Sequence, residues 1–198
     1  EQADVVVMCL GLDATIEGEE GDAGNEYASG DKPSLRLPGL QQELLEKITA
    51  IGKPVILVVL AGSAMDLSWA DKNVDAIIDA WYPGARGGRA VAELIFGDYS
   101  PSGKLPVTFY EDETELPEFT DYSMSNRTYR YSKAKALYPF GYGLKYTDIK
   151  YSGETLDRSC ASVGDEITIS AQVSNNGTYD VNEIVQAYIK HVDALDYE

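Results

Sequence analysis

The sequence is poor in the residues that build several common kinds of catalytic and metal site. Its 198 residues include two cysteines and one histidine. Two cysteines exclude a disulfide-rich scaffold, and no disulfide between Cys9 and Cys160 is expected. A single histidine, His191, argues against a Ser-His-Asp triad, a Cys-His dyad or a multi-histidine metal site. The sequence predicts a buried strand position for Cys9 and a solvent-facing strand position for His191.

Positive charge is also scarce. Sixteen lysines and arginines oppose thirty-three aspartates and glutamates, which gives a formal net charge of -17. Such a surface repels phosphate backbones and anionic lipid, so neither nucleic acid nor a membrane is expected as a partner. The apolar fraction of 44% is too high for a disordered acidic tail.

Long apolar runs are absent. The longest are Val5–Leu10 and Pro54–Ala61, far short of the roughly 20 residues that span a bilayer. No basic segment followed by an apolar stretch opens the chain, so no signal peptide is visible. The sequence therefore predicts a cytoplasmic protein, with secretion left open.

The first half of the chain alternates short apolar runs with helical patterns. The run at Val5 is rich in β-branched residues, as expected for a strand that is covered on both faces. Pro38 opens a helical stripe that includes Leu44, Leu45 and Ile48. This alternation predicts an α/β domain over residues 1–97, with a mostly parallel sheet sandwiched by helices. Strands are expected near 5–11, 54–60 and 76–81, and helices near 38–51 and 85–96.

The pattern changes twice in the second half. Residues 98–146 contain four prolines and many tyrosines, which predicts a wrapping and linking segment with short extended pieces. Residues 147–198 read as a partial all-β segment. Glu166–Val173 and Ile184–Lys190 alternate in the period of a strand, and Asn175–Gly177 is a strong turn signal.

An acidic loop, Asp13–Asp31, joins the first predicted strand to the first predicted helix. It carries seven carboxylates and no basic residue. It follows the carboxyl end of a parallel strand, where open α/β sheets place their ligand sites. It is also long for such a connection, which usually has a handful of residues. The charge, length and position of this loop therefore make it the candidate functional site.

Four interpretations of the acidic loop compete. It can be a solvated surface loop, or it can bind calcium, although the alternating Asp/Asn spacing of a helix–loop–helix calcium site is missing. A dinucleotide site is disfavoured because the loop lacks G-x-G-x-x-G and would repel a pyrophosphate. The fourth interpretation is a carboxylic acid that donates a proton, since crowded like charges raise a carboxyl pKa.

Several motifs resemble glycoside hydrolase family 3, starting with the run I-E-G-E-E-G-D at Ile16–Asp22, which is similar to the acid/base loop of that family. The resemblance extends in order over nearly the whole chain. Its two C-terminal motifs, Val173–Gly177 and Glu183–Tyr188, are similar to the fibronectin type III-like domain that follows this domain in the family. The other matching blocks are Leu37–Leu45, Gly52–Val58, Tyr82–Gly84, Gly97–Thr108, Tyr138–Leu144, Val173–Gly177 and Glu183–Tyr188.

The resemblance implies a retaining β-glycosidase, similar to β-glucosidases, that hydrolyses terminal β-linked sugars of an oligosaccharide or glycoside. It implies two carboxylates: a nucleophile on a separate (β/α)8-like barrel domain, and an acid/base on the loop of the present domain. No region of this chain has the length or the repeats of that barrel. The chain is therefore expected to be one part of the enzyme, inactive alone, without a cofactor or a metal.

The resemblance also assigns roles within the loop. The family pattern G-E-x falls on Gly18–Glu20, which makes Glu19 the expected acid/base, with Glu17 and Glu20 as alternatives. Asp22 and Asn25 are expected to contact sugar hydroxyls. An Asp31–Lys32 pair stands where members often carry Asp-Arg. The alternative from another class is a non-catalytic α/β module that binds carbohydrate or supports a partner.

Overall fold

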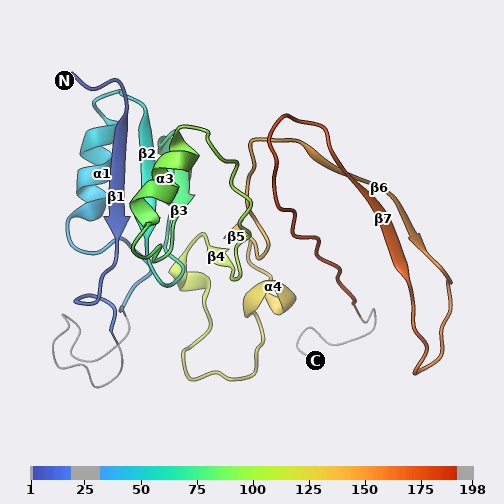
Figure 1. Ribbon diagram of the computed structural model, residues 1–198. Coiled ribbons are helices and arrows are strands. Elements are labelled where there is room, and N and C mark those ends of the chain that lie inside the picture. The colour runs from blue at the N-terminus through green and yellow to red at the C-terminus, as the bar shows by residue number, and fades with distance from the viewer. Residues whose placement is uncertain (1, 19–31, 191–198) are drawn as a thin grey trace. The chain divides into compact units, whose positions relative to one another are not determined.

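The computed structural model describes residues 2–18 and 32–190 (Figure 1). The chain divides into two compact units. The first comprises residues 1–92, 104–142 and 186–198, and the second comprises residues 93–103 and 143–185. None of the described helices is long and apolar enough to cross a membrane.

A parallel sheet forms the centre of the first unit. Its strands are β1 (Val6–Gly11), β2 (Val55–Leu60) and β3 (Ala76–Asp79), in the order β1-β2-β3. Both strand pairs are parallel, as the alternation of apolar runs and helices predicted. The predicted helices are present as α1 (Gln41–Thr49) and α3 (Gly87–Ile95).

The core of the first unit is built around β2, the central strand. Val55, Leu57 and Val59 are fully buried, and Leu45 of α1 packs with them in the same cluster. Full burial of one such side chain stabilises the fold by about 1.5–3 kcal/mol. This rigid centre fixes the carboxyl ends of the three strands, where the candidate site lies.

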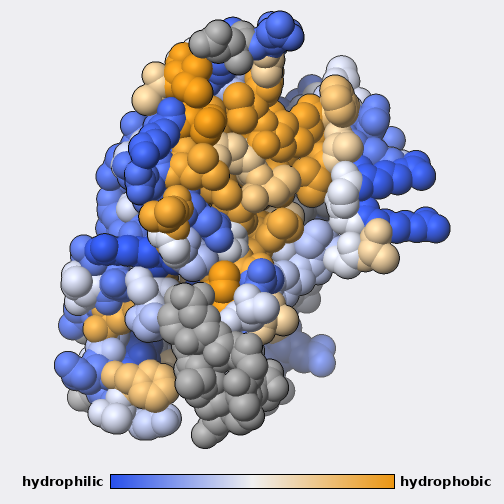
Figure 2. All heavy atoms as spheres, turned by 90° about the vertical axis from the view of Figure 1, so that its left-hand side faces the viewer, coloured by the Kyte–Doolittle hydropathy of each residue, from blue (hydrophilic) through white to orange (hydrophobic). Residues whose placement is uncertain are grey.

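The first strand differs from the prediction, because only one of its faces is covered. Met8 is buried in the core cluster, whereas Val7 is 46% exposed and Cys9 is exposed. The physical reason is that β1 lies at the edge of the sheet and side chains alternate between its faces. Cys9 is thus in a strand, as expected, but it is not buried. Figure 2 shows apolar side chains gathered over much of the side that carries α1 and β1.

A short helix, α2 (Ser68–Asn73), follows β2 in a stretch where the sequence analysis expected no helix. Two parallel strands need a crossover connection, and α2 supplies part of it. The side chain of Asp66 accepts a hydrogen bond from the backbone N–H of Ser68 at 3.0 Å at the start of this helix. Ala70 is buried in the core, and Trp69 packs against it.

Short elements complete the first unit. Among them, β4 and β5 pair antiparallel, and Phe109 of β4 is buried against Trp81, with ring centroids 6.4 Å apart. These elements are β4 (Phe109–Tyr110), the 3-10 helix η1 (Glu113–Glu115), α4 (Thr128–Tyr131) and β5 (Ala136–Tyr138).

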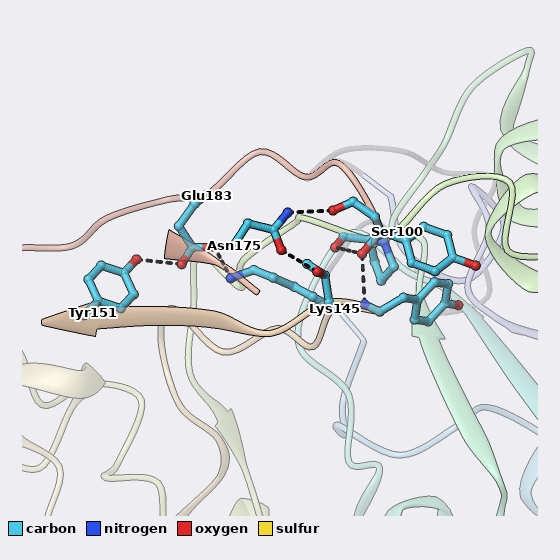
Figure 3. Close-up of polar contacts among 9 residues, drawn as sticks. Ser100, Lys145, Tyr151, Asn175 and Glu183 are labelled. Atoms are coloured by element: carbon cyan, nitrogen blue, oxygen red, sulfur yellow. Dashed lines mark hydrogen bonds and ion pairs between the residues drawn. The ribbon is translucent and has the colours of Figure 1, made fainter. Parts of the chain in front are cut away.

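The second unit contains a two-stranded antiparallel sheet made of β6 (Ile149–Leu156) and β7 (Ile169–Asn175). Polar contacts join its segments (Figure 3). The Lys145 ammonium forms an ion pair with Glu183, and both side chains are largely buried. The Tyr151 hydroxyl donates to the same carboxylate at 2.7 Å.

The second strand predicted for the C-terminal segment is not formed. Residues 184–190 alternate in the period of a strand, but they belong to no strand in the structure. A strand needs a neighbour to supply its ladder of hydrogen bonds. Within the described residues, the sheet that contains β6 and β7 has no third strand. The alternation in the sequence was therefore not sufficient to make a strand.

Candidate functional site

Three loops meet at the carboxyl ends of the parallel strands (Figure 1). Glu17 belongs to the connection after β1, Ser63 follows β2, and Tyr82 follows β3. The Ser63 hydroxyl donates to Oε1 of Glu17 at 2.7 Å. The Tyr82 hydroxyl donates to Oε2 of the same carboxylate at 3.2 Å. The start of the acidic loop is thereby tied to the loops that follow both other strands.

Lys32, the residue that follows the acidic loop, is tied to the same place. The Lys32 ammonium donates to the carbonyl of Ala64 at 2.6 Å and lies 3.0 Å from Sδ of Met65. Burial lowers the pKa of the Lys32 ammonium, while the negative charge of Glu17 acts in the opposite direction. The loop after β2 therefore bonds to Glu17, before the segment 19–31, and to Lys32, after it.

The backbone at the end of β1 is fixed before the acidic loop begins. The Gln41 side chain accepts from the N–H of Gly11 at 2.7 Å and donates to its carbonyl at 2.9 Å. Gly11 has a φ of +140°, and a Cβ there would lie 2.0 Å from the carbonyl oxygen of Leu60. Only glycine fits this approach. The carbonyl of Asp13 then accepts the N–H of Glu17 at 3.0 Å, which closes a turn.

The residue before Tyr82 has an unusual backbone conformation. Trp81 has a φ of 52°, in the left-handed region that bulky residues rarely adopt. Such a conformation costs on the order of 1–3 kcal/mol, and packing must hold it in place. The contact of Trp81 with buried Phe109 supplies such packing. The strained residue directly precedes Tyr82, whose hydroxyl contacts Glu17.

A second carboxyl group lies near this edge of the sheet, at the end of β3. Oδ1 of Asp79 accepts a long hydrogen bond of 3.5 Å from the N–H of Trp81. Oδ2 is buried and accepts no hydrogen bond within the described part of the chain. Burial raises the pKa of the Asp79 carboxyl from an ordinary 3.8 to about 6.

Replacing Asp79 with asparagine is expected to stabilise the protein at neutral pH. The folded state favours the protonated carboxyl of Asp79. Its contribution to folding stability is therefore fully present below about pH 4 and is lost as the pH rises through about 6. Asparagine carries no charge at either pH and avoids this loss. Asp79→Asn should raise the melting temperature of this domain by about 2–4 °C at pH 8. The difference should vanish at pH 4. Calorimetry at both pH values checks this, with the exposed Glu118→Gln as the control; equal melting temperatures at pH 8 would contradict it.

The structure describes one of the acidic residues proposed for catalysis. Glu17 is half-buried and bonded as above. Glu19, Glu20, Asp22 and Asn25 lie outside the described residues, as does His191. Within the described ranges, no group of three or more His, Cys, Asp and Glu side chains is placed to hold a metal ion.

Ser63 and Tyr82 were not singled out from the sequence as partners of the acidic loop. They lie 46 and 65 residues from Glu17 along the chain, so no local spacing connects them. A usable signal was present: each follows a predicted parallel strand, and the carboxyl ends of parallel strands share one edge of the sheet.

Comparison with known proteins identifies the family. Residues 1–146 match the family model described as the glycosyl hydrolase family 3 C-terminal domain. The chain belongs to glycoside hydrolase family 3. Over 192 residues it is 43% identical to a xylan 1,4-beta-xylosidase of Xylanibacter ruminicola, and this match covers 96% of the chain. It is 32% identical to a periplasmic beta-glucosidase of Salmonella typhimurium over 98% of the chain.

The structure agrees with this assignment to glycoside hydrolase family 3. It superposes on a β-glucosidase of Erythrobacter marinus with a TM-score of 0.75 and 38% sequence identity, over 89% of this chain and 23% of that one. The chain spans 22% of the X. ruminicola protein and 26% of the S. typhimurium protein. It thus corresponds to about a quarter of the length of these family 3 relatives.

Proposed function

We propose that this chain is the part of a retaining β-glycosidase that supplies the acid/base carboxylate. The observation that carries the proposal is the placement of the described residues on either side of the acidic segment 19–31. Glu17 and Lys32, which flank the segment 19–31, both bond to the loop after β2 at the carboxyl end of the sheet. Open α/β sheets bind ligands at this edge, and the curated family 3 relatives are named β-xylosidases and β-glucosidases.

In the proposed mechanism, Glu19 acts twice. As an acid it protonates the glycosidic oxygen while the nucleophile attacks the anomeric carbon, and as a base it then deprotonates the water that releases the sugar. Glu17 is the less suitable candidate in this loop. Both of its oxygens already accept hydrogen bonds from hydroxyl groups of neighbouring loops, so this carboxylate is engaged in holding the loop.

The nucleophile in this proposal lies elsewhere in the parent protein, on a (β/α)8-like barrel domain. The relatives are about four times as long as the matching region, which leaves ample length for such a domain. We also propose that residues 147–198 are part of a fibronectin type III-like domain, since β6 and β7 pair antiparallel and are almost entirely exposed. The substrate class is a terminal β-linked xylose or glucose.

Product stereochemistry tests the proposed function in the full-length parent. Hydrolysis of p-nitrophenyl β-xyloside or β-glucoside, followed by proton NMR, should show the β-anomer first, with mutarotation to the α-anomer later. The matching α-glycosides serve as controls and should not be cleaved. Initial release of the α-anomer would contradict retention. Absence of cleavage with every β-glycoside tried would favour a non-catalytic module.

A further inference from the structure

We propose that Ser63 and Tyr82 are positioning residues for proton transfer, which act by holding the carboxylate of Glu17. The inference rests on the proposed function, because it names residues that serve the same acid/base loop. Neither hydroxyl belongs to the loop itself. Each comes from the connection that follows a different strand, so the three strands of the sheet jointly fix one carboxylate.

The two bonds are complementary in geometry and in charge. Ser63 donates to one oxygen of Glu17 and Tyr82 to the other, so the carboxylate cannot rotate without losing a bond. Burial, followed by the charge and hydrogen bond of Glu17, raises the pKa of the Tyr82 phenol. The phenol therefore stays protonated and remains a donor. Hydrogen bonds to a charged acceptor are roughly twice as strong as neutral ones.

The position of Glu17 gives these bonds a consequence for catalysis. Glu17 lies two residues before Glu19 in the sequence, so its anchorage fixes the chain just ahead of the proposed proton donor. Proton transfer requires heavy atoms within about 2.6–3.2 Å, and a misplacement of about 1 Å can cost about 10²-fold in rate. Lys32 anchors the other side of the segment on Ala64, beside Ser63.

Gly62 keeps the ring of Tyr82 close to Glu17. A Cβ on Gly62 would lie 2.8 Å from Cε2 of Tyr82 and 3.4 Å from Oε2 of Glu17. The tyrosine side chain is 52% exposed and can therefore swing away without opening the core. Gly62→Ala should thus fold normally but displace the Tyr82 hydroxyl. Gly62→Ala therefore breaks the hydrogen bond between Tyr82 and Glu17 without changing either of these side chains.

The experiment measures leaving-group dependence in the full-length parent. Tyr82→Phe, Ser63→Ala and Gly62→Ala should each lower kcat for alkyl β-glycosides about 10-fold, and the Ser63/Tyr82 double variant about 100-fold. Dinitrophenyl glycosides need little protonation to depart, so their kcat for glycosylation should fall less than threefold. Tyr122→Phe, at a tyrosine that is 85% exposed, is the matched control and should behave as the wild type.

The pH profile separates positioning from direct proton transfer. Glu17→Gln should slow the hydrolysis of alkyl glycosides about as much as the Ser63/Tyr82 double variant does. Its kcat/KM should still fall at high pH, because that fall reports deprotonation of the general acid. Glu19→Gln should lose that fall. Consider a parent that retains configuration and depends on Glu19. Equal rates for Tyr82→Phe, Ser63→Ala and the Tyr122→Phe control would then overturn this inference and leave the proposed function standing. Loss of the high-pH fall in Glu17→Gln rather than Glu19→Gln would also overturn it, because Glu17 would then be the acid/base.

Discussion

Glu19→Ala in the full-length parent is expected to slow the hydrolysis of alkyl or sugar leaving groups by about 10²–10⁴-fold. A poor leaving group departs as an unstable alkoxide unless an acid protonates it in the transition state. Dinitrophenyl leaving groups are stable anions, so their glycosylation step should suffer much less. Comparing kcat/KM for the two substrate classes, in wild type and variant, measures this difference.

Azide provides the second part of this test. Without the acid/base, no group activates water, so the glycosyl-enzyme should accumulate even when dinitrophenyl glycosides are used. Azide needs no base and should restore turnover by capturing the sugar as a β-glycosyl azide. The product identifies the step that the missing carboxylate performed, independently of the rate.

Neighbouring carboxylates are the controls for Glu19. Glu20→Ala should show little leaving-group dependence. Glu17→Ala should show no more than the roughly 100-fold loss with alkyl glycosides that is expected of the Ser63/Tyr82 double variant, and neither variant should respond to azide. Rescue of Glu17→Ala or Glu20→Ala, with Glu19→Ala unchanged, would move the acid/base by a few residues within the loop. If azide rescues none of the three, the acid/base lies outside this run of glutamates.

The isolated 198-residue chain is expected to hydrolyse no aryl glycoside. Retention requires a nucleophilic carboxylate about 5–5.5 Å from the acid/base, on the opposite side of the sugar ring. Under the proposed function that carboxylate lies on a barrel domain of the parent, so the chain alone should neither form the glycosyl-enzyme nor bind the sugar between two domains. Initial-rate assays with dinitrophenyl β-xyloside and β-glucoside provide the most permissive measurement.

The parent enzyme, assayed at the same molar concentration, is the positive control for the isolated chain. A folded state of the chain should be verified by circular dichroism before the assay. Turnover by the pure chain that disappears on replacement of a single carboxylate within it would show that both catalytic groups lie in these residues. That result would remove the need for a barrel domain.

Much of the sheet domain was predictable because its signals are local. The apolar runs at β1, β2 and β3 and the helical stripe at α1 follow from side-chain periodicity. The helix α2 was missed because six residues give too short a stripe. Residues 184–190 show the opposite error, since alternation is a local property whereas a strand also needs a partner.

The sequence by itself determined the alternation of β1, α1, β2, β3 and α3, and it placed a carboxylate-rich loop after the first strand. Tertiary structure decided that β1 is an edge strand, which exposes Cys9. It also decided that Ser63 and Tyr82 meet on Glu17. The physical reason is that periodicity reports which face of an element is apolar, whereas edge positions and contacts between distant loops depend on how the strands pair. In a parallel sheet that pairing brings the loops after β1, β2 and β3 to one edge, however far apart they lie in the chain.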